Sequence, residues 1–246
     1  MPYREREHLI LEYLKKKGEA TVEELCRAVF VSEPTMRRDL ARLNGKEKII
    51  RTHGGAMLRS FPGENIPQSY REREHSEEKI EIGKKCLSLI NDGDTVMVDG
   101  SSTAQALLSV ISSKKSLIVI TNSAKAATIL DGANVRLFVT GGETATNSYA
   151  YVGSYAEDFL RTFNADICFF SVRTLTEDGL LTDNAIAENS VRRVMMSRSK
   201  KSVLMLDSKK LGAPCTNTLC NIDSVSHVVC ETDISDYFPA YKNKFI

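Results

Sequence analysis

Six short apolar segments alternate with helical segments after about residue 76, and this alternation constrains the fold more than any other feature. The apolar segments are rich in β-branched residues and have the length of strands. They occupy 95–99, 117–121, 135–140, 166–172, 202–207 and 227–231. Helical patterns near 77–91, 102–113, 123–131, 152–163 and 185–200 separate them. Such alternation predicts an α/β domain with a mostly parallel sheet and helices on both faces.

The first 58 residues follow a different pattern. Residues 3–17 repeat apolar side chains at helical spacing. Thr21 and Glu24 form a capping box that begins a second helix, and Ser32 is the expected N-cap of a third. Residues 48–55 then end in two glycines and predict a two-stranded β-wing. Three short helices and a wing indicate a winged helix-turn-helix.

These patterns divide the chain into three parts. We predict a winged helix-turn-helix domain over 1–58, a linker over 59–75 that contains prolines, and an α/β domain over 76–246. The charge run over 71–78 is either a functional basic patch or the solvated start of a helix, and its alternating signs favour the helix start. The first 60 residues carry 13 Lys and Arg against 9 Asp and Glu, whereas the remainder is mildly acidic. A basic N-terminal part favours a polyanion as its partner.

Cysteine usage and hydropathy indicate a reducing, aqueous compartment. The six cysteines form no C-x-x-C pair, and no histidine stands at a metal-ligand spacing from any of them, so we expect free thiols and no metal site. The N-terminus lacks the apolar core of a signal peptide, and the longest apolar runs have only strand length. We therefore expect a cytoplasmic protein without a membrane partner.

The third predicted helix has the features of a DNA-reading helix. Met36 and Leu40 form its apolar stripe, which leaves short hydroxyl residues and arginines towards solvent. Arginine binds guanine bidentately or pairs with phosphate, and Arg51 and His53 on the wing are placed for phosphate or the minor groove. The alternative is a three-helix protein-interaction module, but helix order, capping and the basic wing favour DNA. The candidate DNA contacts are Ser32, Thr35, Arg37, Arg38, Arg42, Arg51 and His53.

Polar strand ends in the α/β domain predict an anion site. Residues 99–103 run from a strand into a helix, where backbone N–H groups and hydroxyls favour phosphate, although simple N-capping accounts for the same residues. Thr121-Asn122 and Gly141-Gly142 follow the next two predicted strands. Ligands of open α/β sheets bind at the carboxyl ends of strands, so we expect these residues at the same site. The candidate effector contacts at these ends are Asp99, Gly100, Ser101, Ser102, Thr103, Thr121, Asn122, Gly141 and Gly142.

Three further charged residues complete the predicted site. Lys210 follows a strand and supplies a cation for phosphate, or it is a surface lysine. Arg173 and Asp183 flank a loop, where they contact sugar hydroxyls or pair with each other.

Two blocks in the first part resemble the DeoR family of bacterial regulators. Residues 31–40 are VSEPTMRRDL and residues 51–56 are RTHGGA, which match the family's helix and wing at family spacing. The resemblance implies a DNA-binding protein, usually an oligomeric repressor of carbohydrate genes.

The resemblance extends over the α/β domain. Residues 99–103 (DGSST), 121–122 (TN), 141–142 (GG) and 207–212 (DSKKLG) are similar to blocks of the family's sensor domain, and Lys210 falls on the family's lysine. That domain is similar in fold to ribose-5-phosphate isomerase, and its effectors are typically phosphorylated sugars. Where many members have Gly-Ala, this chain has Ser171-Val-Arg-Thr174.

Two other functions compete with the sensor. A DNA-tethered sugar-phosphate isomerase needs a carboxylate base and an electrophile, and the candidates are Asp99, Glu143, Asp183 and Lys210. A corepressor that binds proteins instead of DNA needs neither. The DNA-binding domain at the N-terminus favours a regulator without a cofactor or catalytic residues. Its expected partners are an operator duplex, a phosphorylated sugar and further copies of the chain.

Overall fold

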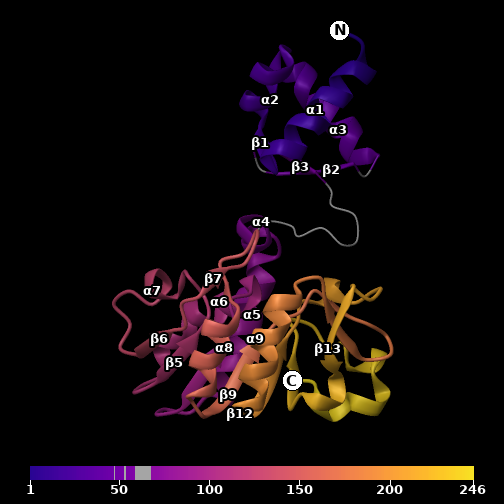
Figure 1. Cartoon of the computed structure of the whole chain (residues 1–246). Coiled ribbons are helices and arrows are strands. Elements are labelled where there is room, and N and C mark those ends of the chain that lie inside the picture. Colours follow the sequence, from indigo (N-terminus) through magenta and orange to yellow (C-terminus); the bar gives the residue numbers. More distant parts are fainter. Residues whose placement is uncertain (47, 53, 59–67) are drawn as a thin grey trace. The chain divides into compact units, whose positions relative to one another are not determined.

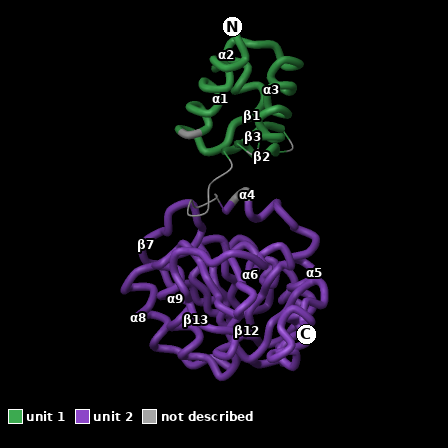
Figure 2. The backbone as a smooth tube through the Cα atoms, turned by 90° about the vertical axis from the view of Figure 1, so that its right-hand side faces the viewer, with its two compact units in different colours: residues 1–64 green, residues 65–246 purple. Residues whose placement is uncertain are grey.

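The computed structural model describes residues 1–46, 48–52, 54–58 and 68–246. The chain divides into two compact units, Met1–Glu64 and Asn65–Ile246, which Figure 2 distinguishes by colour. Each unit has hydrophobic clusters of its own. The two units are therefore described separately.

The first unit contains three helices and a small antiparallel sheet. The helices are α1 (Tyr3–Lys17), α2 (Val22–Val29) and α3 (Glu33–Gly45), and the strands are β1 (Glu19–Thr21), β2 (Ile49–Arg51) and β3 (Gly55–Leu58). Met36, Leu40 and Leu43 of α3 are fully buried in its core, as their spacing predicts. The winged helix-turn-helix expected from the sequence is confirmed.

Local signals set the ends of these helices. Gly18 caps α1, and Thr21 and Glu24 form the predicted capping box of α2. Ser32 is the N-cap of α3, although its hydroxyl lies 3.1 Å from the Thr35 hydroxyl and does not cap the backbone. The wing differs from the prediction in one respect: β1 joins it, so that the sheet order is β1-β3-β2.

The second unit is built on a six-stranded, fully parallel sheet of order β14-β12-β9-β4-β5-β6 (Figure 1). Its strands are β4 (Thr95–Val98), β5 (Ile118–Thr121), β6 (Arg136–Val139), β9 (Ala165–Phe170), β12 (Ser199–Met205) and β14 (His227–Val229). The larger helices are α5 (Ser76–Cys86), α6 (Ser102–Val110), α8 (Ser154–Arg161) and α9 (Ile186–Ser197), and α7 (Ala126–Ile129) is short. All six strands match segments predicted from the sequence.

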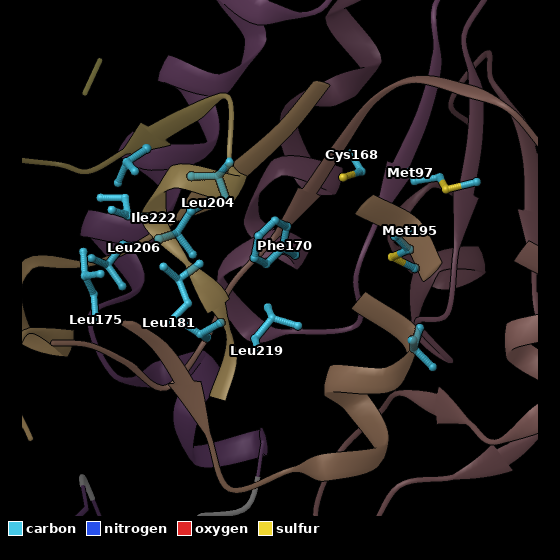
Figure 3. Packing of buried hydrophobic residues seen from close by; sticks show 14 of the residues in the cluster. Met97, Cys168, Phe170, Leu175, Leu181, Met195, Leu204, Leu206, Leu219 and Ile222 are labelled. Atoms are coloured by element: carbon cyan, nitrogen blue, oxygen red, sulfur yellow. The ribbon is translucent and has the colours of Figure 1, made fainter. Parts of the chain in front are cut away.

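Successive strand residues point to opposite faces and create two cores. Met97 and Phe170 belong to a cluster that includes residues of α8 and α9 (Figure 3). Val98 and Phe169, their neighbours in sequence, belong to a second cluster that includes residues of α5 and α6. Burial on both faces explains why these strands are apolar throughout instead of alternating with polar residues.

Smaller elements complete the second unit. A second, antiparallel sheet of order β10-β11-β13 consists of β10 (Thr174–Leu175), β11 (Leu180–Asp183) and β13 (Asn217–Asn221). The hairpin of β7 (Glu143–Thr144) and β8 (Tyr151–Val152) lies beyond β6 in sequence. Helix α4 (Gln68–Arg73) belongs to the second unit, although its residues fall within the segment predicted as linker. No described helix is long and apolar enough to span a membrane.

The strand order reverses direction between β4 and β9. From β4 the chain proceeds outward through β5 and β6, returns to β9 on the other side of β4, and continues outward through β12 and β14. Connections therefore diverge at the carboxyl ends of β4 and β9, the kind of position where open α/β sheets bind ligands.

Candidate functional site

A polar cavity of about 190 Å³ lies at this divergence. Ser101 and Ser102 line it after β4, Ser171 lines it after β9, and Asp207 lines it after β12. Its lysines and arginines outnumber its carboxylates. The basic lining residues are Arg71, Lys79, Arg173, Arg192, Lys209 and Lys210, and the acidic ones are Glu74, Asp183, Glu188 and Asp207.

A buried arginine holds the acidic wall together. The Arg192 side chain on α9 is only 2% exposed. It donates from Nε to Asp99 at 2.9 Å, and its terminal nitrogens donate to Asp183 at 2.9 Å and Glu188 at 3.0 Å. Asn189 accepts a further bond at 2.8 Å. One guanidinium thus links the end of β4, the end of β11 and the first turn of α9.

This cluster fixes the charge state of Asp183. Burial raises the pKa of its carboxyl group, but the charge of Arg192 and hydrogen bonds from Ala185 and Arg192 outweigh burial and leave the pKa below its usual value. Asp183 is therefore an ionised acceptor at neutral pH.

Hydroxyl groups surround the Lys210 ammonium in the site. Its ammonium donates to the hydroxyls of Ser171 at 2.8 Å and Thr103 at 3.1 Å, and lies 3.4 Å from Asp207. Burial lowers the pKa of Lys210, against the opposing charge of Asp207. The lysine predicted from the sequence is thus built into the carboxyl ends of β9 and β12, and is not a free surface residue.

Hydrogen bonds hold the turn before α6. Ser101 is the N-cap of α6: its hydroxyl accepts from the Ala104 N–H at 3.2 Å and donates to Asp99 at 2.5 Å. Asp99 also accepts from the Ser101 N–H at 3.2 Å. Because Asp99 in turn binds Arg192, the N-terminal end of α6 and the acidic wall form one network.

The structure brings some predicted effector contacts together and separates others. Ser101, Ser102, Arg173, Asp183 and Lys210 line the cavity. Asp99 and Thr103 do not line it, but bind Arg192 and Lys210, which do. Gly100, Thr121, Asn122, Gly141 and Gly142 are not among the lining residues.

Packing of the segment around β8 explains that separation. Asn122 exchanges backbone and side-chain hydrogen bonds with Tyr151, and a Cβ at Gly100 would lie 2.7 Å from the Ala150 Cβ. A Cβ at Gly142 would lie 2.9 Å from the Val152 carbonyl oxygen. The end of β5 is thus covered by the chain itself, and Gly100 permits that close approach, whereas Gly142, beyond the end of β6, is exposed.

Sequence reasoning missed the contributions of α4, α5 and α9. Arg71, Glu74, His75 and Lys79 line the cavity but fall in or beside the segment expected to be a linker. Arg192 was missed because an arginine within a helix is usually solvated. Its spacing of four residues from Glu188 on the same helix was the one available signal.

The first unit presents the predicted DNA contacts on α3 and the wing. Arg38 and Arg51 are exposed. Arg37 pairs with Glu33 one turn earlier, and Arg42 stacks over the Tyr3 ring at 4.5 Å. The Arg37–Glu33 pair is exposed on both sides and therefore weak. Ser32 and Thr35 lie at the start of α3, and His53 lies outside the described residues.

One residue of the α3 block has a structural task that the sequence did not reveal. Asp39 is buried and accepts two hydrogen bonds from Arg6 of α1, at 2.6 and 2.9 Å. Such a bidentate pair fixes α3 against α1. In the segment Arg37-Arg38-Asp39, the arginines therefore face solvent and the aspartate anchors the helix.

Comparison with known proteins identifies both units. Residues 6–60 match the model of the DeoR-like helix-turn-helix domain, and residues 74–232 match the model of the DeoR C-terminal sensor domain.

Curated relatives match over most of their length. The chain is 32% identical to the HTH-type transcriptional regulator GolR of Listeria innocua, covering 94% of this chain and 91% of the relative. It is 33% identical to the HTH-type transcriptional repressor GlcR of Bacillus subtilis, covering 85% and 81%. It is 30% identical to the glycerol-3-phosphate regulon repressor of Escherichia coli, covering 93% and 89%.

Solved structures share the fold at low identity. The delta subunit of eIF2B from Chaetomium thermophilum aligns with a TM-score of 0.50 at 15% identity, covering 68% of this chain and 60% of that one. A ribose 5-phosphate isomerase from Methanocaldococcus jannaschii aligns with a TM-score of 0.43 at 15% identity, covering 56% of each chain.

Proposed function

The chain belongs to the DeoR family of transcriptional regulators, and from that premise we propose that it represses carbohydrate-metabolism genes and releases its operator when a phosphorylated sugar binds. The observation that carries the effector proposal is the cavity between β4 and β9. It combines the N-terminus of α6, a surplus of basic side chains and an ordered acidic wall. A relative is named as a glycerol-3-phosphate regulon repressor, which is consistent with a phosphorylated effector.

Each end of the cavity suits one part of such a molecule. A phosphate group is stabilised by the first turn of α6, with the Ser102 hydroxyl and Lys210 beside it. Asp183 and Glu188 accept hydrogen bonds, and Arg173 donates them, which suits sugar hydroxyls. We propose these residues as the effector contacts.

We propose that α3 enters the major groove of the operator. In this assignment Ser32, Thr35, Arg37 and Arg38 approach base edges, and Arg42, Arg51 and His53 bind phosphates or the minor groove. One small head offers few contacts, so we propose that the protein acts as a homo-oligomer with two or more linked heads. The partner is chromosomal DNA, which gives a cytoplasmic protein.

We propose no catalytic activity, against the isomerase alternative. A general base must be able to take up a proton, but Asp99 and Asp183 both accept hydrogen bonds from Arg192, and the pKa of Asp183 is lowered. Glu143 is exposed on β7 and does not line the cavity. An assay of sugar-phosphate turnover tests this point: stoichiometric binding without product supports a sensor, and catalytic turnover contradicts it.

The effector proposal is tested by calorimetric titration of the full chain with phosphorylated sugars and with the same sugars lacking phosphate. We expect binding of at least one phosphorylated compound and no binding of its unphosphorylated form. Ser102→Glu places a carboxylate at the phosphate position, and Lys210→Ala removes the cation. Both variants should lose effector binding, while circular dichroism confirms that they fold. Unchanged effector affinity in the double variant would place the site elsewhere.

A further inference from the structure

We propose that Arg71 and Lys79 are effector-binding residues, so that the α4–α5 elbow, residues 68–79, forms a wall of the effector site. The inference rests on the proposed function, because it takes the ligand of the cavity to be an anion. It goes further because it assigns part of the site to residues 68–79. In the sequence, these residues come directly after 59–67, which follow the DNA-binding unit.

The elbow turns sharply beside the cavity. Helix α4 ends at Arg73 and α5 begins at Ser76. Between them His75 has φ 54°, a left-handed conformation that histidine adopts more readily than most residues. This turn places side chains from both helices on the cavity, which Arg71, Glu74, His75 and Lys79 all line.

Lys79 holds the elbow closed and contributes charge. Its side chain is buried, and its ammonium donates to the backbone carbonyl of Arg71 and, at 2.6 Å, to that of Glu74. These carbonyls lie at the C-terminal end of α4, where a cation is stabilised. Burial, together with the nearby charge of Lys210, lowers the pKa of Lys79 to about 8. An anion in the cavity would relieve the repulsion between these two lysines.

Arg71 contributes charge on the α9 side. Burial lowers the pKa of its guanidinium, which also experiences the charges of Glu188, Asp183, Arg173 and Arg192. Its planar fork of N–H donors matches phosphate geometry. Lys210 supplies a point charge from the end of β12. A phosphate bound at α6 therefore has basic groups from the core and from the elbow as partners.

The start of α4 is tied to the same loop that begins α6. The buried Gln68 side chain donates to the Gly100 carbonyl at 2.7 Å and accepts from the Tyr149 N–H at 2.6 Å. Lys125 pairs with Glu72 at 2.6 Å. An effector that contacts both Ser102 and Arg71 would thus bridge α6 and α4.

Calorimetry with inorganic phosphate and with the tightest-binding phosphorylated sugar tests the assignment. Arg71→Gln and Lys79→Met should each weaken binding of both probes by about 10- to 100-fold, the effect of losing one charge-assisted hydrogen bond. The matched control is Arg73→Gln, which removes the same charge from the same helix but does not line the cavity. It should bind within about twofold of wild type, a difference well below one such bond.

Hydrogen exchange supplies a second readout that does not depend on affinity alone. At saturating ligand, amides of residues 68–79 should exchange more slowly in the wild type and in Arg73→Gln, and Arg71→Lys should recover part of the affinity lost in Arg71→Gln. Wild-type affinity in both Arg71→Gln and Lys79→Met, with binding lost in Lys210→Ala, would overturn this inference and leave the proposed function standing. Absence of binding of either probe to the wild type would overturn both.

Discussion

Replacement of Arg192 by leucine should destabilise the second unit strongly. Arg192 neutralises three carboxylates whose side chains are only 3%, 12% and 8% exposed, namely Asp99, Asp183 and Glu188. Removal of one partner from a buried ion pair costs about 3–5 kcal/mol, because the remaining charge stays desolvated. Here three carboxylates lose a common partner, so we expect a loss within or above that range, against a total domain stability of about 5–15 kcal/mol.

The stability lost in Arg192→Leu should depend on pH in the opposite direction to the contribution of Asp183 in the wild type. In the wild type the pKa of Asp183 is lowered, so its contribution to stability is present at neutral pH and disappears as pH falls through the folded-state pKa. Without Arg192, burial and the repulsion of the neighbouring carboxylates should raise the pKa of Asp183 above its value in the unfolded chain. The Arg192→Leu variant should therefore gain stability as pH falls from 8 to 5, opposite to the contribution of Asp183 in the wild type.

Urea unfolding followed by circular dichroism at pH 8, 7, 6 and 5 measures the effect, and hydrogen exchange of peptides from β4 and β9 assigns it to the second unit. The matched control is Arg193→Leu, which removes an exposed arginine from the same helix together with one bond to the Thr218 carbonyl. It should cost about 1 kcal/mol or less. The reasoning fails if Arg192→Leu unfolds like the control, or if lower pH destabilises it further.

Three other outcomes follow from the structure. Arg37→Ala and Arg38→Ala should each weaken operator binding about 5- to 150-fold, the range for losing a bidentate base contact, whereas the control Arg27→Ala on α2 should not weaken it. Fluorescence anisotropy measures these affinities, and wild-type affinity in both α3 variants would refute the assignment of α3 to the groove. Effector affinity should fall between pH 7 and 9.5, because Lys79, with a pKa of about 8, loses its proton there. In calorimetry, the affinity of Lys79→Met should depend less on pH than that of the wild type, and the same pH dependence in both proteins would contradict the role of the elbow. Asp39→Ala should destabilise the first unit by about 1–3 kcal/mol and weaken operator binding without touching DNA, and an unchanged thermal transition of that unit would show that its ion pair is dispensable.

The main elements of both units were predictable because each depends on the spacing of residues close together in the sequence. Six strands of the second unit were found from short, β-branched apolar runs, and the helices of the first from capping residues and apolar spacing. Short elements escaped: the sequence predicted neither β1 nor α4, nor the strands β7, β8, β10, β11 and β13. Strand β1 has only three residues, and α4 lies in a segment whose prolines and charges resemble a linker. Both are stabilised by long-range partners, β1 by β3 and the start of α4 by Gly100, which no local pattern reveals.

The site was predictable only in part, because its position depends on strand order. Polar residues after β4, β5 and β6 look equivalent in sequence, and we expected them to share one ligand. The sheet instead places β9 next to β4, so the cavity opens between those two strands, while Tyr151 and its neighbours cover Asn122. Lys210 reaches the cavity because β12 lies beside β9.

If a phosphorylated sugar in the β4–β9 cavity controls DNA binding, operator affinity must change when that sugar binds. Fluorescence anisotropy of an operator duplex, obtained by selection from random sequences, is measured with the full chain at fixed salt, with and without saturating phosphorylated sugar. Couplings between two sites are typically about 1–3 kcal/mol, so operator affinity should fall roughly 5- to 150-fold, and the response should be absent in the Ser102→Glu, Lys210→Ala double variant. Operator affinity that is identical with and without a sugar phosphate shown by calorimetry to be bound would contradict the account.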